Sequence, residues 1–160
     1  MIILYRILIN TLFLFTPLIL AYRLIKKKEA LYRFKEKFGF FSRKKMSGKL
    51  IWFHGASVGE LQSIIPLLEI YEKDRSINQI LVTSNTLSSL KIIKNIKLDK
   101  VIHQFFPIDV NFLAKKFVNY WKPSIAFFVD SEIWPNMIIS LKKKKTPLIL
   151  INGRITKKSF

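Results

Sequence analysis

The sequence contains no cysteine among its 160 residues, which excludes disulfide bonds, thiolate metal sites and cysteine nucleophiles. It has only five glycines and two histidines. No G-x-G-x-x-G follows an apolar run and no G-x-x-x-x-G-K-[ST] occurs, so neither a dinucleotide site nor an NTP site is indicated. His54 and His103 have no second histidine at ligand spacing, and we interpret both as structural residues rather than metal ligands.

Acidic residues are also scarce: ten Asp and Glu stand against 28 Lys and Arg, a formal net charge of +18. Such a balance ordinarily indicates nucleic-acid binding, because clustered cations bind phosphate. The distribution favours a membrane instead. Residues 23–49 hold eleven basic residues and two acidic ones directly after an apolar stretch, which is typical of a segment held to anionic lipid. We therefore expect an inner membrane, and no nucleic acid, among the partners.

An almost uncharged apolar run over residues 7–22, extended by residues 2–5, approaches the ~20 residues that a membrane-spanning helix needs. We assign residues 1–25 as a membrane anchor. The basic residues that follow place its C-terminal side in the cytoplasm by the positive-inside rule. A cleaved signal peptide is the alternative, but no small-residue cleavage site precedes the basic cluster. An uncleaved segment can either cross the membrane or insert from one side.

Residues 26–49 are interpreted as a basic juxtamembrane segment, with an amphipathic helix over 30–41 and then a linker. From Leu50 onward, continuously apolar runs alternate with stretches of helical periodicity. The expected strands are 50–54, 79–83, 101–106, 124–129 and 147–151, and the expected helices are 60–73, 86–96, 110–121 and 135–144. This alternation predicts an α/β fold in residues 50–160, a Rossmann-like doubly wound parallel sheet covered on both faces.

Ligands of doubly wound sheets bind at the carboxyl ends of the strands, where the strand order reverses. In a Rossmann-like order that point lies between the first and fourth strands. Glu60 follows the first strand, and Asp130 and Glu132 follow the fourth. We therefore expect acids that are far apart in the sequence to converge at one crevice.

Each acid also has a structural interpretation. The sequence SVGE over residues 57–60 fits a capping box, in which Glu60 returns to the backbone at the helix start. Asp130 and Glu132 precede a helix with Pro135 in its first turn, where carboxylates stabilise the helix dipole. Arg154, after an Asn-Gly pair at a strand end, is a candidate ligand for phosphate or carboxylate because its guanidinium binds in a bidentate way.

Three segments carry a resemblance to a known family: residues 51–60, residues 127–136 with their acid-Trp-Pro-Asn stretch, and residues 151–154. The chain resembles the N-terminal part of the bacterial transferases of Kdo, 3-deoxy-D-manno-oct-2-ulosonic acid. These are membrane-bound, inverting, metal-independent glycosyltransferases without a cofactor, built from two Rossmann-like domains in the GT-B arrangement. They transfer Kdo from CMP-Kdo to a lipid A precursor, lipid IVA.

The resemblance implies roles for particular residues. Glu60 coincides with the proposed general base, Asp130 with a transition-state-stabilising carboxylate that is usually Glu in the family, and Glu132 with its second acid. Ser57, Gly59 and Arg154 are the corresponding candidates for substrate binding.

The resemblance also implies that residues 50–160 form the acceptor-side domain. Because the chain stops after the fifth expected strand, we expect the donor domain to be absent from it and the chain to be inactive alone. A function of a different class, a membrane-tethered module that binds anionic lipid or nucleic-acid phosphates without catalysis, is the alternative.

Overall fold

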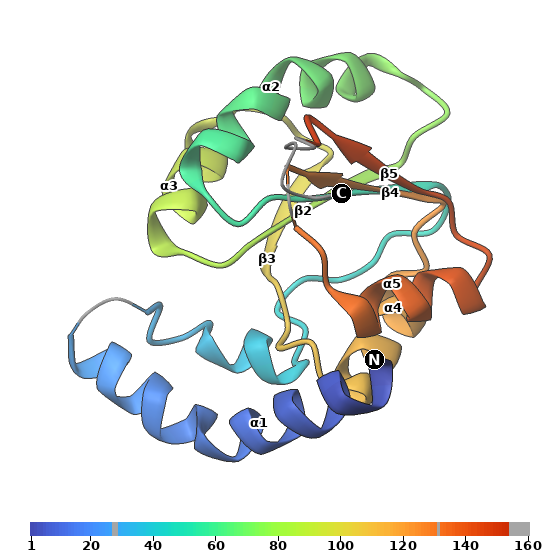
Figure 1. Cartoon of the computed structure of the whole chain (residues 1–160). Coiled ribbons are helices and arrows are strands. Elements are labelled where there is room, and N and C mark those ends of the chain that lie inside the picture. The colour runs from blue at the N-terminus through green and yellow to red at the C-terminus, as the bar shows by residue number, and fades with distance from the viewer. Residues whose placement is uncertain (27–28, 131, 154–160) are drawn as a thin grey trace.

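The computed structural model describes residues 1–26, 29–130 and 132–153. A five-stranded parallel sheet in the order β3-β2-β1-β4-β5 forms the centre of the fold (Figure 1). The strands are β1 (Leu50–His54), β2 (Gln79–Ser84), β3 (Val101–Phe105), β4 (Ile125–Val129) and β5 (Leu148–Ile151). The helices of this domain are α2 (Val58–Lys73), α3 (Leu87–Asn95), α4 (Asn111–Trp121) and α5 (Pro135–Lys143). The α/β fold predicted from the alternation is confirmed, and every strand and helix expected from Leu50 onward is present within two residues of its expected ends.

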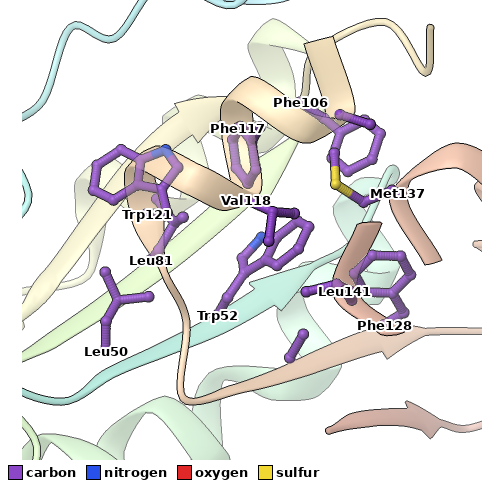
Figure 2. Close-up of a cluster of buried hydrophobic side chains, with 12 residues drawn as sticks. Leu50, Trp52, Leu81, Phe106, Phe117, Val118, Trp121, Phe128, Met137 and Leu141 are labelled. Carbon is purple, nitrogen blue, oxygen red and sulfur yellow. The ribbon is translucent and has the colours of Figure 1, made fainter. Parts of the chain in front are cut away.

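Strand β1 has neighbours on both sides and contributes to a core on each face of the sheet. Its side chains alternate between the faces, as in any strand. Trp52 enters the core that α4 and α5 cover, where it packs against Phe117 and Phe128 (Figure 2). Phe53 enters the opposite core, which includes Leu61 of α2. All five residues of β1 are buried, which explains why the strand is continuously apolar up to His54.

The basic segment before β1 differs from the helix expected over residues 30–41. A turn leads into a five-residue 3-10 helix, η1 (Phe34–Phe38), which ends at Gly39 with a left-handed backbone (φ 75°). The physical reason is the buried Glu36, whose carboxylate accepts a hydrogen bond from the backbone N–H of Phe105 at 2.6 Å. Arg33 donates to both carboxylate oxygens of Glu36, at 2.6 and 2.9 Å. These contacts tie the segment to the end of β3, so periodicity does not decide its conformation.

The expected linker also packs on the domain. Phe41 stacks on Tyr120 of α4 with 3.8 Å between ring centroids, and the Tyr120 hydroxyl donates to the backbone oxygen of Arg43. The side chain of Gln79 bonds the backbone at Lys44 and Met46. This part of the basic segment is therefore attached to the α/β domain by specific hydrogen bonds and aromatic contacts.

His103 is a buried structural residue, as the sequence indicated. Arg33 donates to its Nδ1 at 3.2 Å, so Nδ1 must accept and Nε2 carries the proton that faces Ser84 Oγ at 2.8 Å. Burial, with the charge of Arg33 as the next cause, lowers the pKa of His103 to about 3. A protonated His103 would place a second N–H group against the Arg33 guanidinium.

This arrangement predicts a loss of stability in mild acid. Below the usual histidine pKa of about 6.5 the unfolded chain binds a proton at this position, whereas the folded chain does not until about pH 3. Lowering the pH from 7 to 5 should therefore reduce the free energy of unfolding by about 2 kcal/mol through His103 alone. Urea unfolding at both pH values should show that a His103→Gln variant lacks this part of the decrease. Equal decreases in the two proteins would contradict the assignment.

Helix α1 (Ile2–Ile25) confirms the expected N-terminal helix, and it lies along the α/β domain (Figure 1). The Tyr5 hydroxyl donates to the Asp109 carboxylate at 2.8 Å, and Arg6 Nε donates to Asn136 Oδ1 at 2.9 Å. In the middle of the helix, Phe13 packs edge-on against Phe38 and Phe112. By length and composition, α1 could cross a membrane, with a mean hydropathy of 1.9 over its most apolar 18 residues.

Candidate functional site

A cavity of about 680 Å³ lies at the carboxyl edge of the sheet, where β1, β4 and β5 end. It is lined by Ser57, Gly59, Glu60, Ser63, Asp130, Asn152 and Gly153. Strands β1 and β4 are neighbours in the sheet, so the loops that carry Glu60 and Asp130 leave it side by side. Two acids that stand 70 positions apart in the sequence thus face one space, at the point where the strand order reverses.

Glu60 lies in the first turn of α2 and takes part in the capping box that its sequence indicated. Ser57 Oγ accepts a hydrogen bond from the Glu60 N–H at 3.2 Å and donates to Glu60 Oε1 at 2.7 Å. Glu60 Oε2 accepts from the N–H of Ala56 at 2.8 Å, one residue before the usual partner in this motif. Each oxygen keeps a further acceptor position. The carboxylate is therefore held in one orientation while it lines the cavity.

Asp130 follows β4 in a left-handed backbone conformation, with φ 54°. Its N–H donates to the backbone oxygen of Ile151 at 2.8 Å, which joins the ends of β4 and β5 beside the cavity. Asp and Asn tolerate this conformation better than other residues with a side chain. Asn152, which also lines the cavity, has the same conformation with φ 55°. The backbone thus gives a local reason for Asp at position 130.

Glu132 does not line the cavity with Glu60 and Asp130. Its Oε2 accepts a hydrogen bond from Trp134 Nε1 at 2.7 Å and lies 3.2 Å from His54 Nε2. Burial by itself would raise the pKa of Glu132, but the hydrogen bonds from His54 and Trp134 outweigh it, and the pKa lies below its usual value. The His54 ring is fully buried and stacks on Phe106, with its Nδ1 3.0 Å from Thr83 Oγ1. His54 is a satisfied polar residue at the strand end, as expected.

Residues 55–59 also fit the pattern G-x-S-x-G, in which α/β hydrolases present a nucleophilic serine. Such a serine needs a histidine within hydrogen-bond reach to accept its proton. Ser57 Oγ instead bonds the N–H and carboxylate of Glu60. Both histidines of the chain, His54 and His103, have other partners in the structure. The local geometry is that of a helix cap and not of a catalytic triad.

The family described as 3-Deoxy-D-manno-octulosonic-acid transferase (kdotransferase) matches residues 32–160, most of the chain. The chain belongs to this family. The match begins within the basic segment and includes the whole α/β domain. The resemblance seen in residues 51–60, 127–136 and 151–154 is therefore confirmed.

Curated Kdo transferases are similar over most of the chain. The 3-deoxy-D-manno-octulosonic acid transferase of Rickettsia bellii is 40% identical over an alignment of 152 residues, which covers 92% of this chain and 36% of that protein. A probable mitochondrial enzyme of Arabidopsis thaliana is 36% identical over 148 residues, 91% of this chain and 33% of the relative. The Haemophilus influenzae transferase is 30% identical over an alignment of 147 residues, which covers 89% of this chain and 34% of that protein. The chain spans about a third of the length of the relatives it matches.

Two residues of the Kdo transferase domain were not singled out from the sequence. Ser63 lines the cavity one turn after Glu60, and its spacing of three residues could have indicated a shared helix face. Asp109 stands just before α4, and from the sequence alone it would be interpreted as the N-cap of that helix. Its carboxylate instead accepts from the N–H groups of Asn136 and Met137, at 2.9 and 2.8 Å, and so caps α5. No local pattern reveals this, because the two segments meet only in the tertiary structure.

The remaining expectations concern ligands. Within residues 1–26, 29–130 and 132–153, no group of three His, Asp or Glu side chains is arranged to hold a metal ion. Arg154, the candidate ligand for phosphate or carboxylate, lies outside the described residues. Ser57 and Gly59 are exposed on the cavity wall, where a substrate can approach the first turn of α2.

Proposed function

We propose that this chain forms the acceptor side of a Kdo transferase that moves Kdo from CMP-Kdo to the lipid A precursor lipid IVA in lipopolysaccharide synthesis. The observation that supports it most is the shared cavity of Glu60 and Asp130, in a chain that belongs to the Kdo transferase family. On this proposal, residues 50–160 are the acceptor domain, and a second Rossmann-like domain holds CMP-Kdo across the cleft.

In the proposed reaction, Glu60 is the general base. A hydroxyl oxygen of the acceptor sugar forms a bond with the anomeric carbon of Kdo, and the bond from that carbon to the phosphate oxygen of CMP breaks. CMP leaves with the electron pair, and the hydroxyl proton passes to Glu60. A carboxylate within hydrogen-bond reach suits this step. The two bonds from Ala56 and Ser57 fix the base, so that little reorganisation is needed when the acceptor arrives.

Other residues have supporting roles in this proposal. Asp130, which lines the same cavity, stabilises positive charge that develops at the anomeric carbon. Glu132 acts from behind the site through its contacts with His54 and Trp134. Ser57, Gly59 and Arg154 bind the acceptor. The reaction uses no metal and no cofactor. Helix α1 keeps the protein at the inner membrane, with the α/β domain on the cytoplasmic side.

A chimera provides the test of this function. The chain replaces the matching segment of the Rickettsia bellii relative, which supplies the rest of a full-length enzyme. The purified chimera should release CMP from CMP-Kdo only when lipid IVA is present, and the lipid should gain the mass of Kdo. The unmodified relative is the control for assay conditions. A folded, membrane-bound chimera that transfers no Kdo, beside an active control, would contradict the proposal and favour a non-catalytic module.

A further inference from the structure

One face of helix α1 packs against the α/β domain, and the opposite face is exposed. Along its whole length, α1 has buried or half-buried side chains at Tyr5, Ile9, Phe13, Thr16, Leu20 and Arg23. These positions recur every three to four residues and therefore lie on one face of the helix. On the rest of the surface, eleven large apolar side chains of α1 are exposed. Monomeric soluble proteins rarely expose so extended an apolar surface to water.

The contacts with the domain are incompatible with a helix that crosses the bilayer. The Tyr5 and Arg6 bonds are near the start of α1. Near its end, Arg23 bonds Glu29 at 2.6 Å, and Lys37 joins the same carboxylate to the backbone oxygen of Asn85, directly after β2. Tyr5 and Arg23 are separated by about 27 Å along the axis at 1.5 Å per residue, nearly the ~30 Å hydrocarbon thickness. If α1 crossed the bilayer, Tyr5 would lie on the opposite side of the membrane from Asp109 and could not bond it. With both ends held at the domain, an α1 that binds the membrane lies parallel to it.

The chemistry of the free surface fits lipid rather than a protein partner. Helix α1 contains no acidic residue, and its charged residues are Arg6 and Arg23. Lys26 follows directly and is exposed. An apolar face with basic residues at its edges complements acyl chains beneath anionic headgroups, the property of helices that insert in the plane of a bilayer.

We propose that α1 is an in-plane membrane helix, with its free apolar face in the cytoplasmic leaflet of a bilayer containing anionic lipid and its other face on the α/β domain. This inference rests on the membrane attachment proposed above, and it specifies that the chain does not cross the bilayer. Asp109 and Asn136, which hold the start of α1, follow β3 and β4 at the carboxyl edge of the sheet. The helix thereby fixes this edge, which carries the cavity of Glu60 and Asp130, relative to the lipid surface.

Nitroxide labels measure the depth of the helix. The chain has no cysteine, so each introduced cysteine is the single labelling site. Leu4→Cys, Thr11→Cys and Leu18→Cys place labels at exposed positions seven residues apart, on one side of α1. The full chain is reconstituted in vesicles of phosphatidylethanolamine and phosphatidylglycerol, and the accessibility of each label to oxygen and to a water-soluble nickel complex gives its depth. Ile9→Cys and Leu8→Cys serve as a matched pair of domain-facing and free positions.

An in-plane helix should give similar, shallow depths at residues 4, 11 and 18, with residue 9 less accessible to oxygen than residue 8. A transmembrane helix would place residue 11 deeper than residue 4 by about 10 Å, and residues 8 and 9 would be equally exposed to lipid. That result would overturn the in-plane orientation but not the attachment. Labels that all remain in water would overturn both, and neither result would depend on Kdo transfer.

Discussion

A Glu60→Gln substitution in the chimeric transferase is expected to lower the rate of Kdo transfer by about 10²- to 10⁴-fold, the usual contribution of a positioned general base. Glutamine cannot accept the proton of the acceptor hydroxyl. It does fill the same space, and it is the other residue that a capping box accepts at this position. The loss should therefore be in kcat, measured as CMP release, with little change in the KM for lipid IVA.

Stability measurements separate the two roles of Glu60. The thermal unfolding of Glu60→Gln should match that of the parent, because the cap is retained. Ser57→Ala removes the hydroxyl that accepts from the Glu60 N–H, and should cost about 1 kcal/mol of stability. A fully active Glu60→Gln enzyme would show that Glu60 is not the general base and only caps α2.

Replacing Glu36 by Gln is expected to destabilise the fold by about 3–5 kcal/mol, because it leaves a mostly buried Arg33 without its counter-charge. The side chains of Arg33 and Glu36 are 15% and 2% exposed, so water compensates neither charge well. The same carboxylate accepts from Phe105 N–H and from Ser42, so several contacts between η1 and the sheet depend on it. Urea unfolding of the chain in detergent micelles measures the change.

Glu69, exposed on α2, is the matched control for this substitution. Glu69→Gln should change the free energy of unfolding by no more than about 0.5 kcal/mol, as is usual for surface positions. If Glu36→Gln and Glu69→Gln are equally stable, the buried ion pair does not hold the basic segment on the domain.

The sequence predicted the α/β domain well because its strands are buried on both faces. A strand such as β1 must be apolar at every position, and the helices between the strands must show one apolar stripe, so both periods are visible without any neighbour. The convergence of Glu60 and Asp130 followed from a general rule for such sheets, since the loops at the switch point leave two adjacent parallel strands.

The conformation of the basic segment and the capping of α5 by Asp109 could not be predicted from the sequence, for a common reason. Glu36 and Asp109 form their bonds with backbone groups 69 and about 27 positions away, so nothing in the neighbouring residues signals these partners. The apolar spacing of residues 30–41 suggested a helix, yet the ion pair of Glu36 with Arg33 and its bond to β3 favour a turn and a short 3-10 helix.

The sequence by itself determined the strands and helices of this Kdo transferase domain, the parallel direction of its strands and the apolar character of α1, because each depends on local periodicity and on burial. Only the tertiary structure decided that Glu132 bonds His54 and Trp134 instead of lining the cavity with Glu60 and Asp130. It alone also decided that α1 lies against the domain, through Tyr5 with Asp109 and Arg6 with Asn136. Hydropathy measures how much a helix avoids water, whereas the orientation of α1 depends on the side chains that hold its two ends.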